Sequence, residues 1–463
     1  MAKNALTLSA FVIVALVQGS PRAEDLLDIY RLAIAEDPQF GQVGSAKRAV
    51  EELHKQARSR LLLPTLNFEA NISKSYQDIT APETGAVSQD FTSRLYQLNL
   101  TQPLFHYDRY VELKQADQRG RQSALELDAA HQELMIRVAE RYIAVLEAED
   151  NLVFSRAETA ALKRQLEQSN QRFEVGLIAI TDVQEAQAGY DLARADEIRA
   201  RNGLDNALEA LREITSAYHR ELASLGDQMP LVGPDPPEID RWARRARGQN
   251  LRLNAAKIAT ELAKAEIRLE SSAHLPTVDL VGTYSQDERG GRFGQAAIDA
   301  TTIGVELNVP IFEGGQVNSR TRAAAHRYHE AEERLEQQRR EVERQSREAF
   351  LGVLTGISRV QALKQALSSS ETAAKATQAG YSVGTRTAVD VVNSERDLLR
   401  ARRDYAQARY DYMLDGLRLK HAAGTLSPED LVLVNGWFTS EAGGEGADLI
   451  GTRRVERGHD IHD

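Results

Sequence analysis

The chain has 463 residues, of which 42% are hydrophobic, 27% charged and only 6% aromatic, and its mean hydropathy is -0.44. This balance is typical of long helices rather than of the compact core of an enzyme. The net charge of -11, without a basic stripe, argues against nucleic-acid binding, and the absence of cysteine excludes disulfides, Cys-ligated metals and a lipid-modified cysteine.

Residues 1–23 are predicted to be a secretory signal peptide. Lys3 supplies a positive start, 10–17 is the apolar stretch, and cleavage is placed after Ala23, although Pro21 suits the third position before the cut poorly. An N-terminal membrane anchor is the alternative. No later stretch reaches about eighteen apolar residues, so membrane insertion would require β-structure.

Two pairs of strands are predicted, over about 64–105 and 276–312. In the first strand, Leu66, Phe68 and Ile72 alternate with Asn67 and Glu69, and the same period of two appears in 96–101, 278–284 and 303–311. One apolar and one polar face is the pattern of a barrel wall between lipid and water. A half-buried soluble sheet shows the same alternation.

Four strands cannot close a membrane barrel, because about eight are the practical minimum. An open edge in lipid would leave backbone groups without partners, so several chains must share the barrel. Two chains would supply 2 × 4 = 8 strands around a filled interior. Three chains would supply 3 × 4 = 12 strands around a pore, which favours a trimer.

Two long helical hairpins are predicted, over about 106–226 and 314–424. Proline is absent from 104–229 and 311–427, and apolar residues recur at heptad-like spacing. Gly176 and Gly384 are expected to end the outgoing helices with positive φ. Thr181 or Asp182 is predicted to cap the first returning helix, and Thr387 the second.

The two halves of the chain repeat the same markers. Leu-Pro-Thr occurs at 63–65 and 275–277, Val-Gly at 175–176 and 383–384, and Asp182 corresponds to Asp390. Their order and spacing predict a tandem duplication, with repeats over 24–230 and 231–438. Each repeat is expected to carry short helices, a strand hairpin and a long helical hairpin. A disordered tail is predicted over 439–463.

These residues resemble the TolC family of outer-membrane ducts for efflux and type I secretion. The strongest motifs are RFEVGLIAITDV (172–183), ARNGLDNALEALREIT (200–215) and AGYSVGTRTAVDV (379–391), and the similarity covers nearly the whole mature chain. The predicted fold class is an α+β membrane protein. Its four transmembrane β-strands contribute to a shared 12-stranded trimeric β-barrel, continued by a long periplasmic α-helical coiled-coil barrel.

The resemblance implies partners rather than catalysis. A homotrimer in outer-membrane lipid would dock a periplasmic adaptor protein and an inner-membrane RND or ABC pump, and would pass drugs or secreted proteins to the exterior. No enzyme activity, cofactor, metal or nucleic acid is expected. The competing interpretation is a soluble periplasmic coiled-coil scaffold or adaptor.

The resemblance also implies functional residues at the hairpin ends. Thr181, Asp182, Tyr381 and Arg386 match the residues that lock the tip closed, although simple helix capping is the alternative explanation. Asp390 matches a charged constriction ring.

Asn393 stands where the family's second ring has Asp. The turns at the two hairpin ends are the expected adaptor-docking sites: Val175, Gly176, Leu177, Val383, Gly384 and Thr385.

Overall fold

The computed structural model describes residues 23–81, 85–226, 229–291 and 294–439. The predicted signal peptide, apart from Ala23, and the predicted tail, apart from Thr439, lie outside these residues. In chain order the elements are α1 (Leu26–Glu36), α2 (Pro38–Leu62), β1 (Thr65–Ala81), β2 (Gly85–Phe105), α3 (Tyr107–Glu174), α4 (Ile180–Thr215), β3 (Ser224–Leu225), α5 (Ile239–Gln249), α6 (Leu251–Ser272), β4 (Thr277–Gly291), β5 (Gly294–Asn308), α7 (Gln316–Ser382), α8 (Ala388–Ala423), α9 (Pro428–Asn435) and β6 (Phe438–Thr439).

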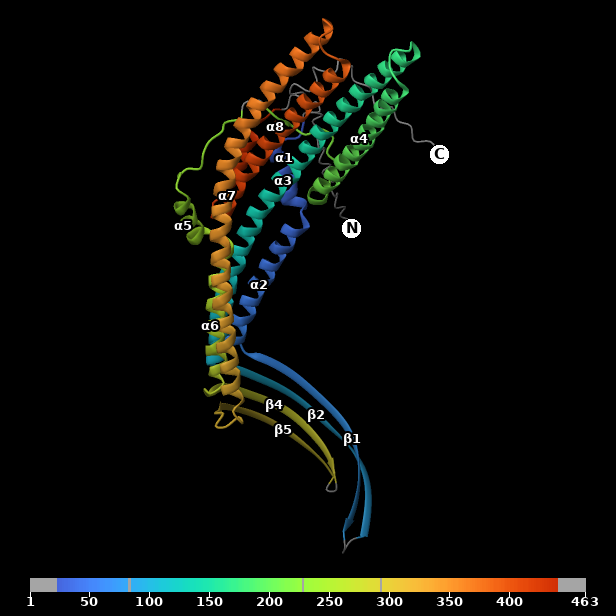
Figure 1. Ribbon diagram of the computed structural model, residues 1–463. Coiled ribbons are helices and arrows are strands. Elements are labelled where there is room, and N and C mark those ends of the chain that lie inside the picture. The colour runs from blue at the N-terminus through green and yellow to red at the C-terminus, as the bar shows by residue number, and fades with distance from the viewer. Residues whose placement is uncertain (1–22, 82–84, 227–228, 292–293, 440–463) are drawn as a thin grey trace, which may run out of the picture.

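The molecule is long and narrow, with a sheet at one end and the turns of two helical hairpins at the other (Figure 1). α3 has 68 residues and α7 has 67, which corresponds to roughly 100 Å of helix at about 1.5 Å per residue. Neither helix contains proline, the residue that would break it. Among the described residues, no helix is both long enough and apolar enough to cross a membrane.

The sheet is antiparallel, in the order β1-β2-β4-β5, so β1 and β5 are its edges. Its register places Phe68 opposite Leu98, and Leu98 opposite Tyr284. The next row, on the opposite face, joins Asn99 to Thr283, whose hydroxyl donates to the Asn99 side-chain oxygen at 3.2 Å. Because side chains alternate along a strand, one face of the sheet is apolar and the other polar.

The apolar face of the sheet is uncovered in the single chain. Leu66, Phe68 and Ile72 of β1 are 65–66% exposed, and Ile303 of β5 is 77% exposed. An uncovered apolar face flanked by two unpaired strand edges is unstable in water by itself. The sheet therefore requires partners beyond this chain.

The helical shaft consists of two hairpins that lie side by side. α3 pairs with α4, and α7 pairs with α8, while α2 and α6 pack along the halves of α3 and α7 nearer the sheet (Figure 1). α3 and α8 also contact each other, and this contact joins the two hairpins within one chain.

A hydrophobic core near the middle of the shaft holds distant parts of the chain together. It combines residues of α1, α3, α4, α8 and α9 with the two-stranded sheet of β3 and β6. Its fully buried members include Leu26, Tyr142, Leu211, Met413 and Leu431. Burying side chains of this size contributes about 1.5–3 kcal/mol each, so this core fixes the first and last described elements, α1 and β6, to the shaft.

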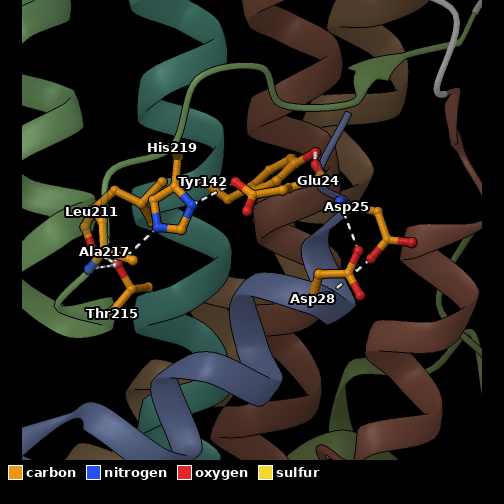
Figure 2. Close-up of polar contacts among 8 residues, drawn as sticks. All are labelled: Glu24, Asp25, Asp28, Tyr142, Leu211, Thr215, Ala217 and His219. Atoms are coloured by element: carbon orange, nitrogen blue, oxygen red, sulfur yellow. Dashed lines mark hydrogen bonds and ion pairs between the residues drawn. The ribbon is translucent and has the colours of Figure 1, made fainter. Parts of the chain in front are cut away.

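Polar contacts fasten the first described residues to this core (Figure 2). The Glu24 N–H donates to the Glu221 carbonyl at 3.0 Å, and its carboxylate lies 2.6 Å from His219 Nδ1. The other ring nitrogen of His219 lies 2.8 Å from the Thr215 hydroxyl. The three side chains have the order of a hydrolytic triad, but Thr215 is 0% exposed, so no substrate reaches it. The cluster is a structural clasp.

Tyr142 connects this clasp to α3. Its hydroxyl lies 2.7 Å from the Ala223 carbonyl and 3.2 Å from the Glu24 carbonyl, and burial raises the pKa of the phenol far above its usual range. Both carbonyls belong to the segments that the core holds, so the hydroxyl joins these two segments to α3.

We predict that Tyr142→Phe lowers the stability of the protein by about 1–2 kcal/mol, because it leaves buried carbonyls without their donor. The midpoint of denaturant unfolding measures this loss. Tyr218→Phe is the control, since Tyr218 is 72% exposed. An equal effect of both substitutions would contradict the role of the Tyr142 hydroxyl.

Candidate functional site

The two hairpin turns have the same backbone structure. Gly176 and Gly384 have φ of +74° and +79°, a region that L-residues with a side chain rarely adopt. The N–H of Leu177 donates to the Arg172 carbonyl at 2.9 Å, and that of Thr385 donates to the Gly380 carbonyl at 2.9 Å. These bonds end each outgoing helix at a glycine with positive φ, as predicted for Gly176 and Gly384.

Exposed apolar side chains lie on both sides of Gly176 in the chain and immediately before Gly384. Val175, Leu177 and Val383 are 70%, 71% and 74% exposed. The protein thus presents an apolar group at each turn, at the end of the shaft furthest from the sheet (Figure 1). Exposed apolar clusters of this kind mark contact surfaces.

The returning helices begin differently from each other. α8 is capped as predicted by Thr387, whose hydroxyl accepts the Asp390 N–H at 3.2 Å. The prediction that Thr181 or Asp182 caps α4 is wrong, because Ala179 occupies that position. The Asp182 carboxylate accepts the Ala179 N–H at 3.3 Å, which allows the helix to start at Ile180.

Asp390 is held as a carboxylate at the start of α8. It accepts the Thr387 N–H and the Thr387 hydroxyl, both at 2.9 Å. These bonds, the backbone one first, together with nearby Arg386, lower the pKa of Asp390 below its usual range. Asn393 lies one turn further along α8 and is exposed.

The predicted lock residues lie at two separate tips. Thr181 and Asp182 are in the first turn of α4, whereas Tyr381 is in the last turn of α7 and Arg386 lies in the turn that follows. Within the described part of the chain, no hydrogen bond or ion pair joins the two groups, and the tips stand apart (Figure 1).

The Arg386 side chain lies against its own hairpin. A Cβ added at Gly380 would come within 2.8 Å of the Arg386 Cγ, so Gly380 leaves room for this side chain at the turn.

A ladder of polar contacts between α3 and α8 was not predicted. It joins Glu140 to Arg418 at 2.7 Å, Glu147 to Gln407 at 2.8 Å, Asp150 to Tyr410 at 2.9 Å, Glu158 to Arg396 at 2.6 Å and Arg164 to Glu395 at 3.9 Å. These contacts run from the mid-shaft core toward the tips and hold the two hairpins together. The only sequence signal is the spacing of the acids at 140, 147 and 158, which places them on one side of α3.

In the middle of this ladder the partners of Glu147 and Asp150 are neutral side chains, although Arg409 lies close enough to lower the pKa of Asp150 in part. Burial, aided by Asp411, raises the pKa of Glu147 to about 7, and burial also raises the pKa of Asp150. The partner of Asp150 is the Tyr410 hydroxyl, whose own pKa is raised by burial and by that carboxylate. By contrast, Glu158 nearer the tips pairs with a guanidinium. At Glu147 and Asp150 the two hairpins are therefore joined by hydrogen bonds from an amide and a phenol, beside residues of the mid-shaft core.

The chain is similar in sequence to known outer-membrane and secretion proteins. A family model described as "Outer membrane efflux protein" matches residues 29–217 and 242–425. "Outer membrane protein TolC" of Vibrio cholerae is 38% identical over 418 residues, which cover 89% of this chain and 93% of that protein. "Alkaline protease secretion protein AprF" of Pseudomonas aeruginosa is 30% identical over 422 residues, covering 90% of this chain and 87% of that protein.

Solved structures agree on the fold. The Campylobacter jejuni CmeC outer membrane channel aligns over 95% of this chain and 98% of that chain, with a TM-score of 0.74 and 15% identity. The open-edged sheet and the paired helical shaft thus define a subunit of an outer-membrane channel. The chain belongs to the outer membrane efflux protein family. It is an outer-membrane exit duct with a helical extension into the periplasm, which decides against the soluble scaffold.

We predict that Glu147→Gln raises the melting temperature at about pH 8 and has little effect at about pH 4. The carboxyl of Glu147 has a higher pKa in the folded protein than in the unfolded chain. It therefore lowers the free energy of unfolding once the pH exceeds the pKa of the unfolded chain, and this loss is complete above the pKa of the folded protein. Thermal unfolding at both pH values measures the difference.

Glu158→Gln is the control for this experiment, because it removes a carboxylate that is paired with Arg396. It should not raise the melting temperature at either pH. An increase for Glu147→Gln that is equal at both pH values would contradict the assignment.

Proposed function

We propose that three copies of this chain form one closed duct with a 12-stranded barrel. The observation that carries the proposal is the sheet order, which leaves one side of β1 and one side of β5 unpaired at opposite edges. Pairing β1 of one chain with β5 of the next satisfies these backbone groups, and 3 × 4 = 12 strands then leave no edge in the lipid.

The two faces of the sheet support this arrangement. The face that carries Leu66, Phe68 and Leu98 would contact lipid, and the face that carries Asn99 and Thr283 would line the water-filled passage. The tandem repeats over 24–230 and 231–438 would give each chain two similar sectors of the duct. Each sector combines one strand hairpin with one helical hairpin.

We infer that contacts between neighbouring hairpin tips close the periplasmic entrance. Arg386 and Tyr381 would bond Asp182 and Thr181 across adjacent hairpins, since a guanidinium can bind a carboxylate and a hydroxyl together. Within the described residues Arg386 has no carboxylate partner at ion-pair distance, which leaves its donors available for such a contact. Exposed links of this kind contribute about 0–1 kcal/mol each, so docking partners can break them.

Asp390 would form a ring of three carboxylates just inside this entrance. Its pKa is lowered by the capping bonds, which supports a permanently charged ring. Asn393 would add three neutral amides one turn further in. The second ring would therefore attract cations less strongly than one built from aspartates.

The exposed turns would receive a periplasmic adaptor. Val175, Leu177 and Val383 supply the apolar contact, and the adjacent glycines permit close backbone approach. The adaptor would connect the duct to an inner-membrane RND or ABC pump. The relatives named for efflux and for alkaline protease secretion support drugs or secreted proteins as the cargo.

The double substitution Arg386→Ser with Tyr381→Phe tests the entrance. We expect it to shift the closed–open equilibrium roughly tenfold toward the open state, because it removes links of about 0–1 kcal/mol from each of three chains. Single-channel conductance in planar bilayers measures the change. The control is Arg199→Ser with Tyr218→Phe. Arg199 lies on α4 and Tyr218 just after α4, both away from the tips. An unchanged low conductance of the Arg386/Tyr381 variant would remove the lock assignment.

A further inference from the structure

The structure exposes a basic patch whose three arginines lie close together in the sequence. α5 buries Trp242, Ala243 and Ala246 against the shaft, and its other side carries arginines. We define the basic patch as Arg244, Arg245 and Arg247 of α5 together with Lys257 of α6. Arg247 is half-buried, and the other three are exposed.

Local contacts hold the patch together without neutralising it. The Lys257 ammonium donates to the Arg247 carbonyl at 3.3 Å, and the Arg245 guanidinium lies 5.1 Å from the centre of the Trp242 ring. The neighbouring acids are engaged elsewhere. Glu238 pairs with Arg241 at 3.1 Å, and Asp240 pairs with Arg347 at 2.7 Å.

In the described residues, none of the four cations of the patch forms an ion pair with a carboxylate. A concentrated positive surface on a chain of net charge -11 attracts a polyanion.

The position of the patch restricts what can reach it. α5 stands out from the side of the shaft between the sheet and the tips (Figure 1). Ala246 packs against Val342, which lies 26 residues beyond the start of α7 at Gln316, so the patch is roughly 40 Å of helix away from the sheet. A further 40 residues of α7, roughly 60 Å, separate Val342 from the tip at Ser382. Lipid headgroups at the sheet are therefore out of reach, and a partner docked at the tips would have to extend roughly 60 Å along the shaft to touch the patch.

The surface of the patch is suited to a hydrated polymer rather than to a protein. Trp242 is 4% exposed, and no large hydrophobic residue between 233 and 274 is exposed in the described chain. Stable protein interfaces have an apolar centre surrounded by a polar rim, and this patch has no such centre. Exposed cations bind a flexible polyanion through many weak contacts, and salt weakens these contacts by screening the charges.

We propose that this patch binds the carboxylate-bearing glycan polymer of the cell wall, which lies in the periplasm beside the shaft. Arg244 and Arg247, three residues apart on α5, would each contact a carboxylate, with Lys257 extending the surface. The inference rests on the periplasmic position of the shaft and not on the tip lock. In a trimer, three patches would bind one polymer network at the same time, which strengthens weak individual contacts.

The test is co-sedimentation of the purified full-length protein in detergent with isolated peptidoglycan sacculi. Wild-type protein should bind at low salt and be released at high salt. The triple substitution Arg244→Ser, Arg245→Ser and Arg247→Ser should weaken binding by at least about tenfold. The matched control is Arg194→Ser, Arg199→Ser and Arg201→Ser, which removes three exposed arginines from α4 and should bind as wild type.

Several results would overturn the proposal. Failure of the wild-type protein to bind, full binding by the α5 variant, or an equal loss in the α4 control would each exclude a specific site for the glycan. The mass of each detergent-solubilised variant is measured in parallel. If the α5 substitutions change the number of chains in the assembly, the patch is a contact between subunits instead. None of these results bears on the conductance of the tip variants.

Discussion

The assembly of this protein depends on the unpaired backbone groups of its two edge strands. β1 and β5 lie at opposite sides of a four-stranded sheet, and the apolar face between them is uncovered. In hydrocarbon, each unsatisfied N–H or carbonyl costs several kcal/mol, so the single sheet has no stable place in a membrane. Closing the edges with further copies of the same chain, as proposed, would resolve this constraint and would orient the polar face toward an enclosed passage.

The same constraint determines what the helices must do. In the proposed assembly the shaft would continue the passage and would be closed at its far end, where the two Gly turns place apolar and charged side chains. The core near the middle of the shaft holds the first and last described elements, while the α3–α8 ladder beside it is polar and contains Glu147, whose pKa is raised to about 7. A core that joins the two hairpins near mid-shaft, and tips that share no hydrogen bond or ion pair within the described residues, would suit the proposed opening at one end without dissociation.

Sequence patterns predicted the parts of this architecture that depend on local physics. Alternation in the strands, proline-free helical tracts and glycine turns all follow from the preferences of the residues themselves. The predicted cap at Thr181 or Asp182 was wrong, because a carboxylate one turn further in can reach back to the Ala179 N–H. The basic patch was missed although its three arginines are sequence neighbours, because the sequence does not show which side of α5 is buried. The α3–α8 ladder was missed because it depends on residues that only packing brings together. Glu158 and Arg396, for example, are 238 positions apart.

The mass of the detergent-solubilised full-length assembly tests the central claim most directly. Closure of the sheet by identical chains predicts a single species with three times the mass of one mature chain, and heating should dissociate it. A monomer or dimer as the stable membrane-extracted species would contradict the account, because neither joins twelve strands into a barrel around an open passage.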